Sequence, residues 1–373
     1  MVLGSGSLKT LDAGLGPLLC GVLTRPNGHD VPLPDSVQRI LVLRPGGMGD
    51  MLLLLPMLDA LHARYPAAVI DLLCEQRNVE VIELAKRHAT PLLYDQRPLR
   101  TLRHLRRHAY DLAIDTEQFH HFSAVMAVLS GSPLRIGFKI NPRRNPLYTH
   151  LVNYSLDAPE ASQFLRLLEP LGIKAPDGDL AVLTTQTLRM PPTDAPAAPA
   201  PARRYAVVHP GATTRYKQWA LQNFVDVALR LNGQCGLDIV FAGGRTDGPV
   251  AAQAAATLTS QGGSGVRVMH GRPLAEVADL VRGATLFIGA DSGLAHLARA
   301  TGTPTVVLFG PSDRKKWGIE DARHRVVCKP QPCAPCFIFG YHRPCREIQC
   351  MHRITVESVL ASCRELLAPP SSS

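Results

Sequence analysis

The sequence predicts an α/β protein with two doubly wound parallel sheets. From Arg39 onward, short β-branched or leucine-rich runs alternate with longer helical stretches, as in parallel strands covered by helices. A Pro/Ala segment over residues 186–203 interrupts this pattern, and we expect it to be an extended linker because proline lacks a backbone donor. The alternation restarts at Tyr205, so we expect two domains, which suits a chain of 373 residues.

We expect four strands in the first domain and five in the second. They cover residues 40–44, 69–73, 112–115 and 134–137, then 205–209, 238–242, 266–269, 286–289 and 305–309. The clearest helices are expected near residues 49–64, 119–130, 160–171 and 354–367. Two such domains would place the carboxyl ends of both sets of strands beside one central cleft, where α/β folds bind ligands.

The domain boundaries follow from this pattern. They are a flexible N-terminal tail (1–37), an N-terminal Rossmann-like domain (38–185), the linker (186–203), a C-terminal Rossmann-like domain (204–353) with a cysteine-rich loop (328–350), and a C-terminal helix and tail (354–373). We expect the first segment to be flexible because Gly16, Pro17 and Gly21 interrupt its weak apolar stretch. That stretch has no clear small-residue cleavage site, so we expect a cytoplasmic protein.

Composition narrows the class of partner. The chain has 40 Lys and Arg against 31 Asp and Glu, a net charge of +9, which attracts anions. Aromatic residues make up only 5% and are not interleaved with the basic ones, so we expect no nucleic-acid partner. The longest apolar run, residues 51–58, is broken by Pro56 and is far shorter than the roughly 20 residues of a membrane helix. An anionic small-molecule or lipid-linked ligand fits best.

The first candidate site is Leu-Arg-Pro-Gly-Gly-Met-Gly-Asp at residues 43–50, between a strand and a helix. Its glycines permit a tight turn and a close approach to a ligand. Asp50 is the one carboxylate there, and it is either a general base or a helix cap. The segment matches neither the G-x-G-x-x-G pattern nor a P-loop.

The second candidate site follows the first strand of the second domain. Thr213, Thr214 and Lys217 come after a Pro-Gly turn and would suit a diphosphate. The alternative is a basic loop in which Trp219 anchors the start of the next helix.

A third turn, at residues 289–296, places Asp291, Ser292 and Gly293 at a helix start, where backbone amides favour an anion. His296 lies among apolar residues, and we expect it to be buried and structural. Asp247 follows a strand that ends in Gly-Gly, so it is our candidate for a ribose hydroxyl.

Four of the nine cysteines lie in a proline-rich loop as C-x-x-C followed by C-x-x-x-x-C. They are Cys333, Cys336, Cys345 and Cys350, with Cys328 as an alternative ligand. Thiolates at such spacing can hold a structural Zn or Fe ion. A disulfide, disfavoured in a reducing cytoplasm, and free thiols stay open as alternatives.

Taken together, three segments resemble glycosyltransferase family 9, the ADP-heptose:lipopolysaccharide heptosyltransferases. They are residues 44–50, residues 209–212 with Lys217 and Trp219, and residues 291–296 continuing to 309–312. Their order and spacing match over roughly residues 39–360. The resemblance implies the two-domain GT-B fold, an ADP-heptose donor, and an inverting transfer that needs no metal or other catalytic cofactor. The cysteine-rich loop resembles a subset of the family that includes protein-modifying heptosyltransferases.

The resemblance also implies roles for individual residues. Asp50 matches the catalytic base, Thr213, Thr214 and Lys217 match the diphosphate contacts, and Asp291, Ser292 and Gly293 match the donor-binding turn. The acceptor is then a lipopolysaccharide core or a related surface glycan, which makes peripheral association with the inner membrane plausible.

Four basic residues of the first domain are candidate contacts for acidic sugars or phosphates of the acceptor. They are Arg44, Lys139, Arg143 and Arg144. A solvated basic surface is the alternative for them. For the whole chain, the alternatives are a GT-B-like sugar-nucleotide hydrolase or epimerase, and a non-catalytic sugar-nucleotide binding protein.

Overall fold

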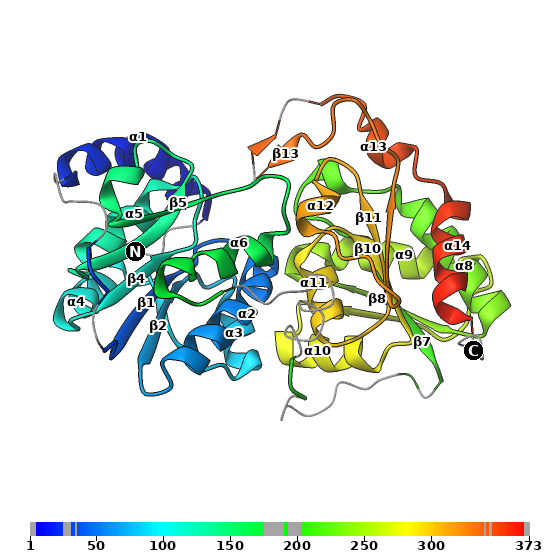
Figure 1. Ribbon diagram of the computed structural model, residues 1–373. Coiled ribbons are helices and arrows are strands. Elements are labelled where there is room, and N and C mark those ends of the chain that lie inside the picture. Colours follow the sequence, from blue (N-terminus) through cyan, green and yellow to red (C-terminus); the bar gives the residue numbers. More distant parts are fainter. Residues whose placement is uncertain are drawn as a thin grey trace. The chain divides into compact units, whose positions relative to one another are not determined.

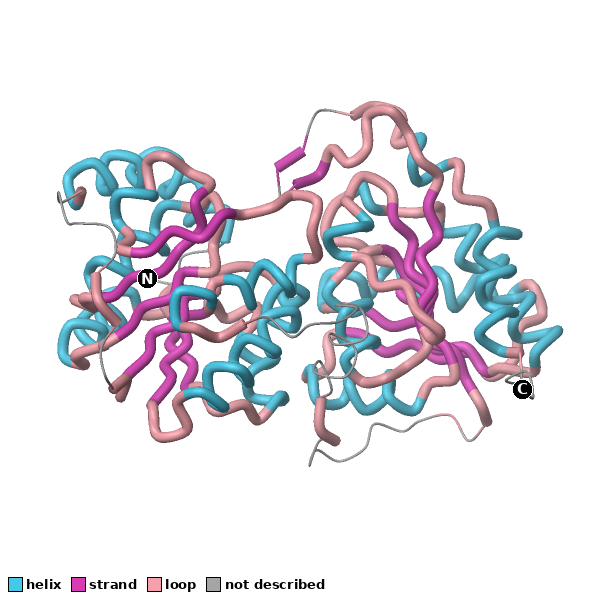
Figure 2. The backbone as a smooth tube through the Cα atoms, viewed as in Figure 1, coloured by secondary structure: helices cyan, strands magenta, loops and turns pink. Residues whose placement is uncertain are grey.

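The computed structural model describes residues 5–24, 31–33, 36–174, 190–192, 201, 203–338, 341–342 and 345–368. The chain divides into two compact units, unit 1 (Met1–Gly178) and unit 2 (Asp179–Ser373). Each unit contains a parallel six-stranded sheet with helices on both faces (Figure 1, Figure 2). The predicted α/β class with two doubly wound sheets is therefore confirmed.

In unit 1 the sheet has the order β3-β2-β1-β4-β5-β6. Its strands are β1 (Arg39–Leu43), β2 (Val69–Cys74), β3 (Thr90–Leu93), β4 (Leu112–Asp115), β5 (Leu134–Lys139) and β6 (His150–Asn153). Its helices are α1 (Ser5–Leu23), α2 (Met48–Arg64), α3 (Val79–Ala85), α4 (Pro98–Arg107), α5 (His121–Leu129) and α6 (Glu160–Arg166), with the short turns η1 (Asn145–Leu147) and η2 (Glu169–Leu171). The strand order reverses between β1 and β4, which is the switch point where doubly wound sheets bind ligands.

In unit 2 the sheet has the order β12-β11-β10-β7-β8-β9. Its strands are β7 (Tyr205–His209), β8 (Asp238–Gly243), β9 (Val266–His270), β10 (Leu286–Ala290), β11 (Thr305–Phe309) and β12 (His324–Cys328), and β13 (Phe337–Ile338) pairs with β14 (Tyr341–His342) as a separate hairpin. Its helices are α8 (Leu221–Cys235), α9 (Gly248–Ser260), α10 (Leu274–Gly283), α11 (Gly293–Ala300), α12 (Arg314–Trp317), α13 (Gln349–His352) and α14 (Val356–Leu367), with the turns η3 (Arg215–Lys217) and η4 (Arg245–Asp247). Here the switch point lies between β7 and β10.

The central strands form the core of each unit. All of β4, β7, β10 and β11 are buried, since helices cover both faces of a parallel sheet. Each of the nine expected strands is present, and β3, β6 and β12 are added at sheet edges. The expected linker at 186–203 lies mostly outside the described residues.

The expectation of a flexible tail over residues 1–37 was wrong for its first half. Ser5–Leu23 form the helix α1, which packs against α5. Gly16 lies so close to α5 that a Cβ added to it would come within 2.5 Å of the His121 Cβ. The glycine that disfavours a helix in isolation is thus what allows these two helices to approach. Within the residues described, no helix has both the length and the apolarity needed to cross a bilayer.

Candidate active site

Asp50 lies beside the switch point of unit 1, in the first turn of α2. The N-cap of α2 is Gly47, and no side chain caps this helix end, so the structure does not support the interpretation of Asp50 as a cap. Its Oδ2 lies 3.3 Å from Nη2 of Arg44, whose side chain is only 4% exposed, whereas that of Asp50 is 32% exposed. Gly46, at φ +123°, makes the turn between them. A buried cation therefore fixes a carboxylate that solvent or a substrate can reach.

Arg44 joins the two strands at the switch point. Its Nη1 donates to the carbonyl of Thr116, directly after β4, at 2.9 Å, and its guanidinium lies over the ring of Phe164. Burial opposes its charge, but the carboxylates of Asp50 and Glu117 outweigh this effect and raise the pKa of Arg44. Arg44 is therefore a permanent cation that the surrounding structure holds in place.

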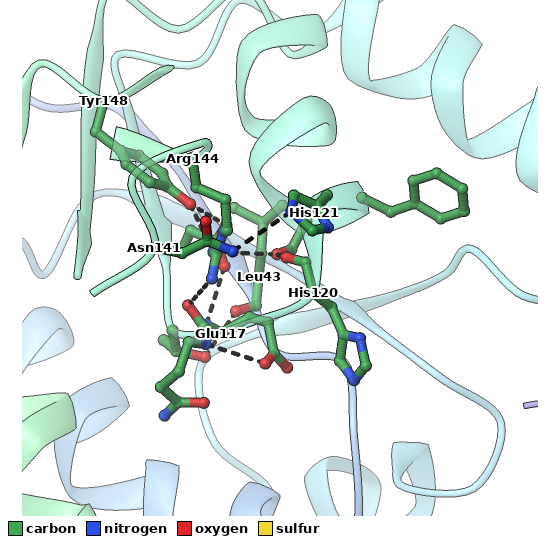
Figure 3. A network of polar contacts seen from close by, with 12 residues as sticks. Leu43, Glu117, His120, His121, Asn141, Arg144 and Tyr148 are labelled. Atoms are coloured by element: carbon green, nitrogen blue, oxygen red, sulfur yellow. Dashed lines mark hydrogen bonds and ion pairs between the residues drawn. The ribbon is translucent and has the colours of Figure 1, made fainter. Parts of the chain in front are cut away.

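A second buried arginine supports the same strand ends (Figure 3). Arg144 donates to a carboxylate oxygen of Asp115 at 2.8 Å, to the carbonyl of Glu117 at 2.6 Å and to the hydroxyl of Tyr148 at 2.6 Å. The Tyr148 hydroxyl in turn donates to Asp115 at 2.7 Å. This network fixes the segment that follows β4 beneath Arg44.

The four basic residues expected to contact the acceptor separate into two pairs. Arg44 and Arg144 are buried and engaged inside unit 1, so in this structure they support the site rather than present a guanidinium to solvent. Lys139 and Arg143 are exposed, at the end of β5 and in the loop that follows it. Only this second pair is open to a ligand in the structure.

In unit 2 the switch point brings together Lys217 and Asp291. The Nζ of Lys217 lies 2.6 Å from Oδ2 of Asp291, and both side chains are largely buried. His296 Nε2 lies 3.7 Å from the other carboxylate oxygen, and His296 is buried as expected. Burial opposes ionisation, but Lys217 and His296 lower the pKa of Asp291 to about 2. Asp291 is therefore ionised across the physiological range and holds the ammonium of Lys217 in position.

Ser292 and Gly293 form the start of α11, as expected. Ser292 is the N-cap, and its hydroxyl accepts the N–H of Ala295, while Gly293 is the first residue of the helix. The remaining backbone N–H groups of this first turn are the kind that bind phosphate oxygens.

Asp247 is connected to the same turn through His209. Its Oδ2 lies 3.3 Å from Nε2 of His209, and Nδ1 of that ring lies 3.4 Å from the Ser292 hydroxyl. Asp247 also accepts the N–H of Gly244 at 2.9 Å, and the hydrogen bond with His209 contributes most to lowering its pKa. A Cβ added to Gly211 would come within 2.6 Å of the Asp247 carboxyl carbon, so this turn requires glycine.

Thr213 and Thr214 precede η3, the turn that carries Lys217. The Thr214 hydroxyl accepts the N–H of Tyr216, so this residue shapes the turn, whereas Thr213 is exposed. Trp219 anchors the segment, because its indole N–H donates to the carbonyl of Ile354 at 3.0 Å. The basic-loop interpretation is therefore correct for Trp219, and it is compatible with a ligand role for Lys217.

The cysteine-rich loop reaches this site through Phe337. The backbone N–H groups of Cys336 and Phe337 both donate to the carbonyl of Pro311, at 2.9 and 3.0 Å, and the Phe337 ring lies 4.9 Å from the Lys217 ammonium. All nine cysteines are free thiols. Within the described residues, no group of three or more His, Cys, Asp or Glu side chains is arranged to hold a metal ion.

Three residues of these sites had no individual role in the sequence analysis, although one of them, His209, begins a segment of the family resemblance. They are Glu117, His209 and Phe337. His209 and Glu117 had a usable signal, since each lies at or just after the carboxyl end of a strand next to the switch point. Phe337 had none, because it lies in the cysteine-rich loop, 120 residues after Lys217 along the chain.

The comparisons with known proteins point to one family. The model of the glycosyltransferase family 9 (heptosyltransferase) matches residues 99–346. Lipopolysaccharide heptosyltransferase 3 of Escherichia coli is 28% identical over 302 residues, which cover 72% of this chain and 82% of that protein. Lipopolysaccharide heptosyltransferase 1 of Salmonella typhimurium is 25% identical over 316 residues, 79% of this chain and 95% of that protein.

Solved structures share the fold. E. coli ADP-heptose lipopolysaccharide heptosyltransferase II is 22% identical, with a TM-score of 0.65 over 88% of this chain and 98% of that one. The iron-containing dodecameric glycosyltransferase TibC of enterotoxigenic E. coli is 16% identical, with a TM-score of 0.57 over 91% of this chain and 78% of that one. The fold is therefore GT-B, as expected. Since the family model matches well over half of its residues, the chain belongs to glycosyltransferase family 9, the heptosyltransferases.

Proposed function

We propose that this protein is an inverting glycosyltransferase that moves heptose from ADP-heptose to a lipopolysaccharide core or a related surface glycan. The observation that carries the proposal is the Asp50 carboxylate, which stays accessible while a buried arginine fixes its position at the switch point. The names of the relatives support the choice of donor and acceptor, since they are lipopolysaccharide heptosyltransferases.

Asp50 acts as the general base. It takes the proton from an acceptor hydroxyl as that oxygen attacks the anomeric carbon of the donor, and the bond from that carbon to the ADP oxygen breaks on the opposite face. One such displacement inverts the configuration. A positioned base contributes typically 100-fold or more to such a step.

Lys217 and the first turn of α11 stabilise the departing diphosphate. Negative charge gathers on the leaving group in the transition state, so fixed cations and N–H dipoles act more strongly there than in the ground state. Asp291 holds Lys217 for this task, and Ser292 and Gly293 supply the N–H groups. Thr213 and Thr214 contact the phosphates. With this charge in place the reaction needs no catalytic metal or other cofactor.

We assign Asp247 to a ribose hydroxyl of the donor. His209 and the N–H of Gly244 keep the carboxylate ionised and oriented, as a hydroxyl donor requires. On the acceptor side, Lys139 and Arg143 bind anionic groups of the glycan, and Arg44 and Arg144 hold the scaffold beneath them.

We also propose a structural Zn or Fe ion in the cysteine-rich loop. The present arrangement of the described residues does not form a ligand group, so the proposal rests on the thiols themselves. Burial raises the pKa of the Cys350 thiol to about 11, and the charges of Cys336, Cys333 and Cys345 add to this effect. Elemental analysis of the purified protein tests this directly.

The donor is tested by titrating the protein with ADP-heptose, ADP-glucose, UDP-glucose and NAD in a calorimeter. We expect ADP-heptose to bind most tightly. Selective NAD binding, or binding of none of the four, would contradict the proposal. Release of ADP in the absence of any acceptor, at the rate seen with acceptor, would instead identify a hydrolase.

A further inference from the structure

Helix α1 carries an apolar face that the described chain leaves uncovered. We call this the α1 face; its side chains are Leu11 (40% exposed), Leu15 (51%), Leu18 (67%), Leu19 (39%) and Val22 (81%). Their spacing of three or four residues places them on one side of the helix. Half of the exposed large apolar side chains of the described residues lie on this helix, and such concentration marks an interaction surface.

The α1 face points outward because the neighbouring face of the helix is fixed to α5. The Asp12 carboxylate accepts the backbone N–H groups of His121 and Phe122, at 3.0 and 2.6 Å, at the start of α5. Burial opposes its ionisation, but these bonds and His120 outweigh it and lower the pKa of Asp12. Gly16 and Cys20 pack on the same side as Asp12. The helix is therefore held in one orientation and cannot bury its leucines against its own unit.

Helix α4 adds a row of cations on the same side of the sheet. The crossovers from β3 to β4 and from β4 to β5 run in one direction across the sheet, so α4 and α5 cover the same face, and α5 contacts both α1 and α4 (Figure 1). Five arginines of this segment are exposed, with Leu99 among them at 70% exposure. They are Arg97, Arg100, Arg103, Arg106 and Arg107.

Acidic side chains are almost absent from these three helices. Within α1, α4 and α5 the sole Asp or Glu is Asp12, which is buried and bonded to α5. An apolar helix beside a cationic one, without exposed carboxylates, is the chemistry of a surface that lies on an anionic bilayer. A second copy of the chain fits less well, because pairing these surfaces would bring two sets of arginines towards each other.

We propose that α1 and α4 dock unit 1 onto an anionic phospholipid bilayer, with the α1 face in the acyl boundary and the arginines of α4 on the lipid phosphates. The inference rests on the proposed function, because docking on a bilayer would bring the enzyme to a lipid-linked acceptor that lies in that bilayer. Binding to vesicles is measured without donor or acceptor, so its failure is distinguishable from a failure of the proposed transfer.

The test is co-sedimentation of the full chain with vesicles of phosphatidylcholine, alone or mixed with phosphatidylglycerol. We expect binding to the mixed vesicles only. Leu15→Glu with Leu18→Glu should weaken it by about tenfold or more, because two leucines no longer enter the apolar layer. Arg103→Glu with Arg107→Glu should also weaken it by about tenfold or more, and added salt should have the same direction of effect.

The matched control is Leu156→Glu with Val268→Glu, which changes two exposed apolar side chains outside these helices and should leave vesicle binding unchanged. All the substituted side chains are exposed, and an unchanged urea midpoint confirms that each variant folds. The proposal is overturned if the wild type does not bind mixed vesicles, or if the α1 variant binds them as well as the control. It is also overturned if light scattering shows a dimer that the α1 variant abolishes while vesicle binding is unaffected.

Discussion

The ion pair between Lys217 and Asp291 has a stability role that can be separated from its role in donor binding. The pKa of Asp291 lies at about 2 instead of 3.8. At about 1.4 kcal/mol per pKa unit, this corresponds to roughly 2–3 kcal/mol in favour of the ionised form in the fold. Lys217→Met removes the main positive charge that offsets the cost of burying the ionised Asp291 carboxylate. We therefore expect the free energy of unfolding to fall by about 3 kcal/mol at neutral pH.

The sign of the pH dependence follows from the lowered pKa. The contribution of ionised Asp291 is fully present above its unfolded pKa of 3.8 and is lost as the pH falls towards 2. The stability difference between wild type and Lys217→Met should therefore shrink across that window. Both tryptophans of the chain, Trp219 and Trp317, lie in unit 2, so urea unfolding followed by tryptophan fluorescence reports on this unit.

The double variant Lys217→Met with Asp291→Asn separates the two roles. It leaves no unpaired buried charge, so stability should recover to within about 1 kcal/mol of wild type. Affinity for ADP should stay about 10- to 100-fold below wild type in both variants, as expected for loss of a charged hydrogen bond. A Lys217→Met protein that is as stable as wild type and binds ADP equally well would refute this reasoning.

Three further predictions concern the supports of the two sites. Arg144→Ala leaves the Asp115 carboxylate buried without its cation, so the free energy of unfolding in urea should fall by about 3–5 kcal/mol. A loss below about 1 kcal/mol would contradict the network around Arg144. Phe337→Ala removes the aromatic ring beside the Lys217 ammonium and should raise the Kd for ADP about threefold, whereas Phe337→Tyr keeps the ring and should leave the Kd unchanged. Equal Kd values for the wild type and both variants would show that this ring does not contribute to ADP binding. Asp12→Ala should cost about 1 kcal/mol and make the N-terminal helix sensitive to limited proteolysis, and an unchanged digestion pattern would show that Asp12 does not anchor it.

The central strands were predictable because their burial leaves a strong signal. β4, β7 and β11 coincide with the expected ranges, as continuous apolar runs bounded by turn residues. The edge strands β3, β6 and β12 were not expected. Each has a neighbour on one side only and is partly exposed, so its sequence mixes polar and apolar residues without a clear period.

The positions of the site residues were predictable, but their partners were not. Turns after strands located Asp50, Lys217 and Asp291, since a doubly wound sheet places such turns at its switch point. Arg44 and Arg144 looked like surface cations because sequence alone does not show burial. The two residues are only 3% and 1% exposed because their side chains are buried against backbone carbonyls that lie far away along the chain. The carbonyl that Arg44 bonds is 72 residues away, and the one that Arg144 bonds is 27 residues away.

Helix α1 shows how tertiary packing overrides local propensity. Gly14, Gly16, Pro17 and Gly21 all disfavour a helix in isolation. The bonds from Asp12 to the start of α5 and the close approach at Gly16 depend on residues more than 100 positions away, so the sequence of the segment alone could not reveal them.

The most direct test of the proposed mechanism is the turnover number of Asp50→Asn, which preserves the size of the side chain but cannot accept the proton. We predict that kcat for heptose transfer falls about 100-fold or more while the Kd for ADP is unchanged. A variant that transfers heptose within a few-fold of the wild-type rate would show that Asp50 is not the base.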